Sequence, residues 1–170
     1  MEHEKPSIKP IAYTYGMYLA LLTITGIVIL YVLNEEQNWI ISLISFLITI
    51  VVYYYGISKY KKENANVLSI KDALKVGMGM ALISGIIAAI YAVVHYGVIA
   101  PEYMDTIREK AMDDMLSQSP NMEGEALEMA TNMVNMFTSK FFMATMFLIS
   151  SLFFGFIISL ITGAIMKNDK

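Results

Sequence analysis

The stretch Val76–Ile99 reads VGMGMALISGIIAAIYAVVHYGVI and holds 24 residues without a single Asp, Glu, Lys or Arg. A helix of about 20 apolar residues spans the roughly 30 Å hydrocarbon core of a bilayer. Three further runs are equally free of charge and hold 23, 19 and 26 residues: Ile11–Leu33, Trp39–Ile57 and Phe141–Met166. Barrel strands would be about ten residues long with alternating polarity, which none of these runs shows. The sequence therefore predicts an all-α membrane protein, one membrane domain over residues 1–170 with four transmembrane helices.

The composition supports this prediction and excludes some chemistry. Hydrophobic residues make up 56% of the chain and charged residues 16%, against roughly 45–50% and 25% in soluble domains. The absence of cysteine excludes disulfides and thiolate chemistry. The net charge of −3 is small, and we expect no nucleic-acid partner. The first run is too long for the apolar part of a signal peptide, so we expect it to be retained.

The distribution of lysine and arginine predicts the orientation, because cytoplasmic loops of membrane proteins carry an excess of both. The N-terminus has two of these residues, the connection Ser58–Lys75 has five and the C-terminal tail has two, whereas the opposite side has three. Four spans place both termini on the same side. We therefore expect both termini and Ser58–Lys75 in the cytoplasm. Ser69 and Asp72 also have the spacing of a capping box, in which the hydroxyl and the carboxylate each accept from a free backbone N–H. This spacing predicts that the third helix starts near Ile70, and Pro101 marks its end.

The segment Ala100–Lys140 separates the last two spans and is acidic, with eight carboxylates and three basic groups. Its apolar residues recur at helical spacing, which predicts two amphipathic helices. We place the break at Gln118–Asn121, with Ser119 as the N-cap of the second helix, which can run on into the fourth span. We expect the apolar stripes to lie against the outer ends of the protein's own spans; a partner protein ranks second as their contact and lipid third. The stripes consist of Met104, Ile107, Ala111 and Met115, and of Met122, Ala126, Met129, Met133 and Phe137.

Small residues recur at every fourth position in three of the predicted spans. Helices in lipid gain little hydrophobic free energy from association, and small side chains let their backbones approach closely. The pattern predicts close helix packing, either within the bundle or between copies of the chain. The residues are Gly16 and Ala20, then Gly77, Ala81, Gly85 and Ala89, and then Ser151, Gly155, Ser159 and Gly163.

His95 is the one ionisable residue in a span that could mark a site, because burying such a group is costly. It follows Tyr91 by four residues. It could relay protons or bind a lipid head group. The interpretation that we favour is an interfacial histidine bonded to Tyr91, a backbone carbonyl or water. No span offers a carboxylate or a second histidine as its partner, which weighs against a proton-coupled transporter.

The chain has 14 methionines, nine of them between Met104 and Met146. Thioethers are soft ligands that suit Cu(I), but flexible methionine also fills irregular packing contacts. We favour packing, because these methionines follow the helical apolar stripes and have no histidine or cysteine nearby. We expect no metal site, no cofactor and no catalytic residues.

Two short motifs resemble a family of uncharacterised Bacteroidota membrane proteins, the DUF4199 family. They are Ile70–Gly77, IKDALKVG, and Ile99–Tyr103, IAPEY. The resemblance covers essentially the whole chain and implies four helices, a lysine-rich middle loop and a bacterial inner membrane. It implies no activity and no catalytic residues. The family pattern has an acidic or amide residue before the proline, where this chain has Ala100.

These features favour a non-enzymatic inner-membrane protein, an accessory or scaffolding subunit of a larger membrane system. The expected partners are the lipid bilayer and either another membrane protein or a second copy of the chain. The alternative is a small transporter or lipid-handling protein that uses the outer helical segment as a lid, with His95 and Tyr91 near its mouth. A membrane enzyme with an outer-face site ranks last.

Overall fold

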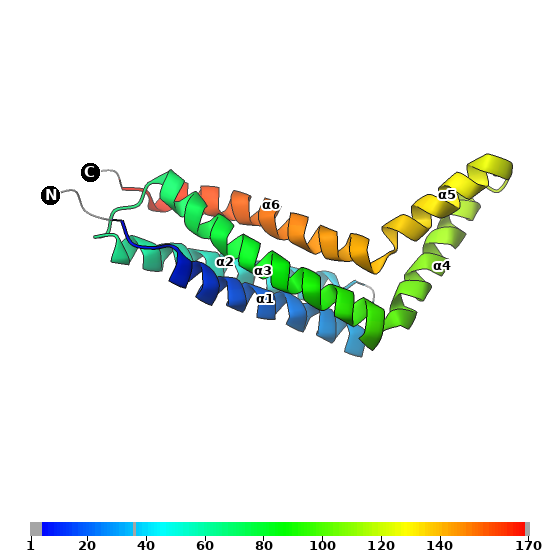
Figure 1. The fold of residues 1–170 in the computed structure, drawn as a ribbon, viewed down its shortest axis with the longest axis horizontal. Helices are drawn as coiled ribbons and strands as arrows, with labels where there is room; N and C mark the ends of the chain where they lie inside the picture. Colours follow the sequence, from blue (N-terminus) through cyan, green and yellow to red (C-terminus); the bar gives the residue numbers. More distant parts are fainter. Residues whose placement is uncertain (1–4, 36, 169–170) are drawn as a thin grey trace. The chain divides into compact units, whose positions relative to one another are not determined.

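The computed structural model describes residues 5–35 and 37–168, which form six α-helices and one π-helical turn. Figure 1 labels the α-helices. No β-strand element occurs among these residues; Leu68 and Asn168 form an isolated bridge. Four helices are long and apolar enough to cross a membrane, which confirms the predicted all-α membrane fold. The elements are α1 (Lys9–Val32), α2 (Trp39–Glu63), α3 (Ile70–Val94), the π-helical turn η1 (His95–Ile99), α4 (Pro101–Gln118), α5 (Gly124–Phe137) and α6 (Lys140–Met166).

The helices begin where the local sequence satisfies free backbone N–H groups. Pro10 lies in the first turn of α1, where its missing N–H costs nothing. The side chain of Asn38 accepts from the backbone of Ile40 and Ile41 at the start of α2. Ser69 Oγ accepts from the backbone of Asp72 at 3.1 Å, and α3 starts at Ile70, as predicted.

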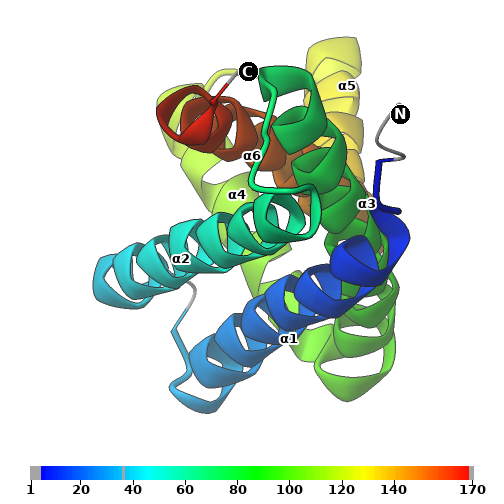
Figure 2. The ribbon, with the colours of Figure 1, turned by 90° about the vertical axis from the view of Figure 1, so that its left-hand side faces the viewer.

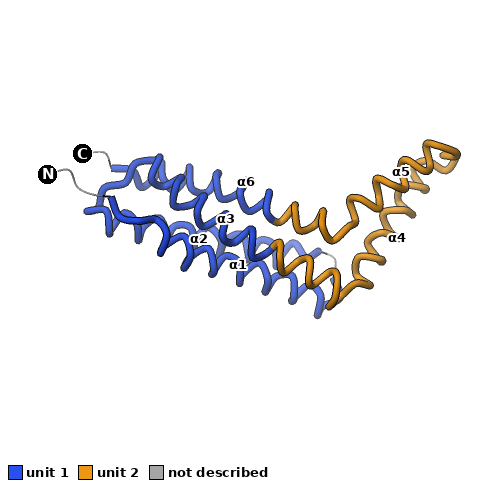
Figure 3. Tube along the Cα trace, in the orientation of Figure 1, with its two compact units in different colours: residues 1–88, 148–170 blue, residues 89–147 orange. Residues whose placement is uncertain are grey.

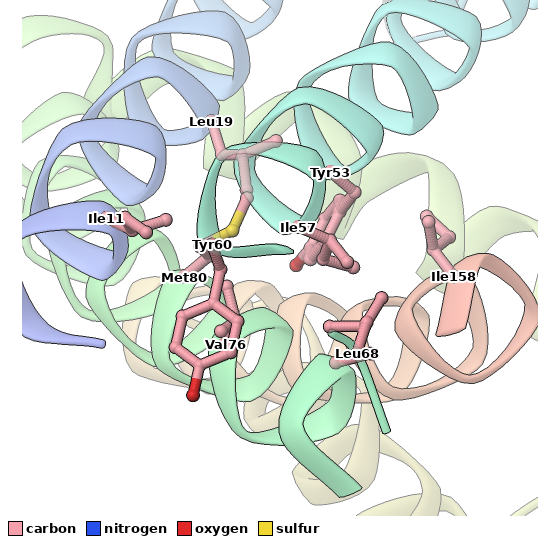
Figure 4. Close-up of a cluster of buried hydrophobic side chains, with 10 residues drawn as sticks. Ile11, Leu19, Tyr53, Ile57, Tyr60, Leu68, Val76, Met80 and Ile158 are labelled. Carbon is pink, nitrogen blue, oxygen red and sulfur yellow. The ribbon is translucent and has the colours of Figure 1, made fainter. Parts of the chain in front are cut away.

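The chain forms two compact units, residues 1–88 with 148–170 and residues 89–147 (Figure 3). The boundaries fall inside α3 and α6. Unit 1 contains α1, α2, most of α3 and most of α6, which Figure 2 shows from the end at which α1 begins and α6 ends. Its buried core gathers side chains from all four helices and from the connection before α3 (Figure 4), namely Ile11, Leu19, Tyr53, Ile57, Tyr60, Leu68, Ala73, Val76, Met80 and Ile158.

The outer surface of unit 1 is apolar. Ile44 and Leu47 on α2, and Ile161 on α6, are exposed. Water-soluble monomers rarely expose contiguous apolar patches larger than a few hundred Å². Small and hydroxyl-bearing side chains such as Ser84 and Ser159 are buried instead. This inversion is expected of helices surrounded by lipid, where small residues line the contacts between helices.

The three lysine-rich segments of unit 1 meet at one end of its bundle. Lys5 Nζ lies 2.7 Å from Asp72 Oδ2, and Leu68 N–H donates to Asn168 Oδ1 at 3.1 Å. The N-terminal segment, the Ser58–Lys75 connection and the C-terminal tail therefore lie together. The capping-box prediction was half right. The Asp72 carboxylate accepts from Lys5 and from the Ser69 hydroxyl instead of a backbone N–H.

Unit 2 contains the helical hairpin α4–α5, which the sequence predicted with two errors. Ser119 ends α4, its N–H donating to Met115 O at 3.1 Å, and α5 begins only at Gly124, whose φ of +62° suits glycine. The turn after Ser119 competes successfully with capping, because Met122 N–H donates back to Ser119 O.

The second error concerns the end of this hairpin. Helix α5 does not run on into the last span, because it stops at Phe137 and α6 starts at Lys140. The N–H of Thr138 still donates to Val134 O, at 2.9 Å. Ser139 Oγ then accepts from the backbone of Phe142 at 3.2 Å, so Ser139 caps α6 at its N-terminus.

Candidate functional site

The small residues of α3 and α6 face one another along a single antiparallel seam in unit 1. A Cβ built on Gly155 would lie 2.6 Å from Ala81 Cβ, and a Cβ on Gly85 would lie 3.1 Å from Ser151 Cβ. Both distances are shorter than ordinary van der Waals contact, which begins at 3.4 Å, so an added methyl group would require a neighbour to move. The seam has one register, in which each step of four residues along α3 matches four residues back along α6. The pairs are Ala73 with Gly163, Gly77 with Ser159, Ala81 with Gly155 and Gly85 with Ser151.

Hydroxyl groups join the two helices at the end of this seam. Ser151 Oγ donates to Ala81 O at 2.8 Å and lies 2.9 Å from Ser84 Oγ. Ser159 Oγ is buried and has no hydrogen-bond partner among the described residues. It occupies the space where a Gly77 side chain would lie. The role of Ser159 is therefore its small size, which lets α3 and α6 approach closely at Gly77.

Helix α1 packs against a second face of α3. A Cβ on Gly16 would lie 2.8 Å from Ile83 Cβ and 3.0 Å from Met80 O, and Ala20 is fully buried. Of the small residues that the sequence singled out, Ala89 belongs to unit 2 and is half-buried. The remainder of the set lies in unit 1, where close contacts between backbones fill the bundle.

His95 opens the π-helical turn η1 and is buried among aromatic rings of unit 2. Its Nδ1 lies 3.2 Å from Tyr91 Oη, a contact that agrees with the favoured interpretation, in which His95 bonds to Tyr91 and marks no site. Its ring meets the Tyr96 ring edge-on, with 5.1 Å between the ring centroids, and the Tyr96 ring stacks on the Tyr103 ring with 5.7 Å between their centroids.

The π-helical turn itself had no signal in the sequence. Ala100 N–H donates to His95 O at 2.7 Å, and Pro101 then opens α4. Gly97 lies against the side chain of Lys140, whose Nζ would be 2.9 Å from an added Cβ. Single π-helical turns often occur at functional sites. Within residues 5–35 and 37–168, however, no group of three or more His, Cys, Asp or Glu side chains could hold a metal ion.

The second amphipathic helix, α5, exposes its methionines. Met129, Met133 and Met136 have exposed fractions of 67%, 49% and 55%. Met104 on α4 is buried, and Met115 is half-buried. Within unit 2, therefore, helix α4 leaves the methionine stripe of α5 exposed.

An ion pair between Lys5 and Asp72 lies at the lysine-rich end of unit 1. The hydrogen bond and charge of Asp72 raise the pKa of Lys5 above its ordinary value of 10.5. Asp72 is buried, whereas the Lys5 side chain is largely exposed. This ion pair holds the N-terminal segment against the first turn of α3.

Comparisons with known proteins assign a family and no activity. Neither the curated proteins nor the solved structures contain a match to this chain. The sequence model described as "Protein of unknown function (DUF4199)" matches residues 14–168. This match covers nearly all of the chain and includes every helix from α2 to α6. The chain therefore belongs to the DUF4199 family.

Proposed function

We propose that this chain is a non-enzymatic accessory or scaffolding subunit of a membrane system in the bacterial inner membrane. One observation carries the proposal. The seam between α3 and α6 is closed by small side chains, whereas the apolar face of α5 is open. A bundle filled by its own backbone contacts leaves little room for a solute, and an open apolar face is typical of an interaction site.

In the proposed orientation, both termini and the Ser58–Lys75 connection lie in the cytoplasm, and residues 100–140 lie on the outer side. Nine lysine residues on the proposed cytoplasmic side, against three basic residues on the other side, support this orientation. The contacts that join the three lysine-rich segments at one end of unit 1 also support it, because these segments must then share one side of the membrane. The α5 face is thereby presented to partners outside the cytoplasm.

Purification in mild detergent tests the accessory role. The chain should bring down a defined partner in fixed ratio. The pair Met129→Gln and Met133→Gln should lose the partner, because glutamine keeps the size and helix propensity but removes the apolar surface. The pair Asp113→Asn and Asp114→Asn is the control, since both residues are exposed and belong to α4. A chain that purifies alone, or a partner retained by the methionine variant, would refute the role.

The alternative function is a small transporter or lipid-handling protein with the outer helical segment as a lid. The observation that favours it is the π-helical turn, which holds buried His95 between Tyr91 and Tyr96. Solute-dependent flux in liposomes would support this alternative, provided that His95→Gln reduces the flux. The accessory role predicts no flux above that of empty liposomes.

A further inference from the structure

The exposed face of α5 combines thioethers and carboxylates within one shallow depression of about 530 Å³. Met129, Met133 and Met136 are spaced by four and three residues and share one side of the helix. Methionine side chains are flexible and polarisable, so they adapt to apolar partners of irregular shape. A surface of this kind suits a protein segment better than a small ligand that requires fixed geometry.

Acidic side chains border the same methionines. Glu125, Glu128 and Asn132 line the depression together with them. Helix α5, GEALEMATNMVNMF, contains no lysine or arginine. Neither carboxylate has an ion-pair partner among the described residues. The depression therefore presents apolar contact area and uncompensated negative charge side by side.

We propose that this face binds a basic amphipathic helix of a partner protein. Lysine and arginine have long apolar stems that can lie on Met129 and Met133 while their charged ends reach Glu125 and Glu128. An amphipathic helix that lays its apolar side on a hydrophobic surface is a recurring mode of recognition. The inference rests on the proposed accessory function and names the chemistry of the partner.

Two other occupants fit the charges less well. Helices that lie on bilayers bind anionic lipid through lysine-rich polar faces, and α5 has carboxylates there. A second copy of the chain would bring Glu125 and Glu128 against the same carboxylates, and like charges across an interface are costly. A cationic amphipathic partner is the occupant that fits both the methionines and the carboxylates of the depression.

A peptide-binding experiment on the full chain tests this inference without knowledge of the natural partner. The protein is placed in nanodiscs of phosphatidylcholine, which carries no net charge, and empty nanodiscs serve as the blank. The probe is a labelled Leu/Lys amphipathic helix of about 18 residues, or five turns. We expect saturable binding that weakens when salt rises from about 0.05 M to about 0.5 M, because screening reduces the attraction. The matched Leu/Glu peptide should not bind.

Surface variants separate the two components of recognition. Glu125→Gln with Glu128→Gln should weaken binding of the Leu/Lys peptide by about tenfold or more and remove most of its salt dependence. Met129→Gln with Met133→Gln should weaken it at all salt concentrations. Asp113→Asn with Asp114→Asn removes the same charge elsewhere and should leave binding unchanged. All three pairs lie on exposed positions, and helical circular dichroism verifies that they fold.

Defined outcomes would overturn the inference. These are no binding above empty nanodiscs, equal binding of the Leu/Glu peptide, or equal losses in the control variant and the Glu125/Glu128 variant. Quenching of a label at Met133→Cys by brominated lipid would identify lipid as the occupant, and cross-linking between two such chains would identify self-association. If the peptide does not bind but a partner still copurifies through α5, the basic helix is refuted and the accessory role is not. Peptide binding with no partner in cells would refute the accessory role alone.

Discussion

A single methyl group tests the seam between α3 and α6. In Gly155→Ala the new Cβ would lie 2.6 Å from Ala81 Cβ and 2.6 Å from Tyr53 Oη. The first contact is the rigid one, because Ala81 Cβ is attached directly to the α3 backbone and cannot rotate away. Ordinary contacts begin at 3.4 Å, so α6 must move away from α3 by about 0.8 Å there, and tight interiors resist such shifts.

The expected cost follows from this overlap. Overpacking by one methylene typically costs about 1–3 kcal/mol, and the gain from replacing glycine in a helix returns about 0.5–1 kcal/mol. We expect Gly155→Ala to lower the free energy of unfolding in detergent. Gly26→Ala is the matched control, since no atom lies within 4 Å of its added Cβ; it should be neutral or stabilising.

The assay is thermal and denaturant unfolding of the purified variants, followed by circular dichroism. A double-mutant cycle adds a direct test of the contact. Ala81→Gly should partly rescue Gly155→Ala, because it removes the rigid partner but leaves Tyr53 Oη. If Gly155→Ala is as stable as Gly26→Ala, or if Ala81→Gly and Gly155→Ala are simply additive, the seam does not pack as described.

Three further predictions concern other parts of the chain. Single cysteines at Glu63 and Gln118, which are both exposed, should label from opposite sides of intact cells, and labelling of both by one impermeant reagent would refute the topology. Ser159→Ala removes a buried hydroxyl without a hydrogen-bond partner among the described residues and should leave the free energy of unfolding unchanged or raise it by about 1 kcal/mol; a clear decrease would show that the hydroxyl is used. Because the pKa of Lys5 is raised, its ion pair with Asp72 stabilises the fold fully below pH 10.5, and this stabilisation is lost as the pH rises through the folded-state pKa. The melting temperature of Lys5→Met should therefore fall less between pH 9 and pH 12 than that of the parent. Equal decreases would contradict this prediction.

The spans and their helices could be predicted from the sequence because they depend on local composition. A run such as Val76–Ile99 has no charged residue to place in water, and length then sets the number of crossings. The four-residue spacing of Gly77, Ala81 and Gly85 marks a helix face in the same local way. It could not show which helix lies opposite. The pairing of Ala81 with Gly155 is a tertiary register, and several registers of two such ladders have the same spacing.

One of the errors comes from an interaction between distant residues, and the others are local. Asp72 was expected to cap α3 through a backbone N–H, but Lys5, 67 residues away, takes its carboxylate. No residue pattern in its sequence, HYGVI, predicted the π-helical turn that begins at His95. Ser139 was a readable signal that was missed, because a serine before an apolar run is a common N-cap.

In-cell photo-crosslinking at the α5 face tests the central proposal most directly. A photoreactive residue replaces Met133 in one strain and Asp113 on α4 in another. We predict that Met133 cross-links to one protein through a basic amphipathic helix, identified by mass spectrometry of the joined peptides, and that Asp113 does not. Adducts at Met133 with lipid alone, with the chain's own spans alone, or with a segment that lacks basic residues would contradict the proposal.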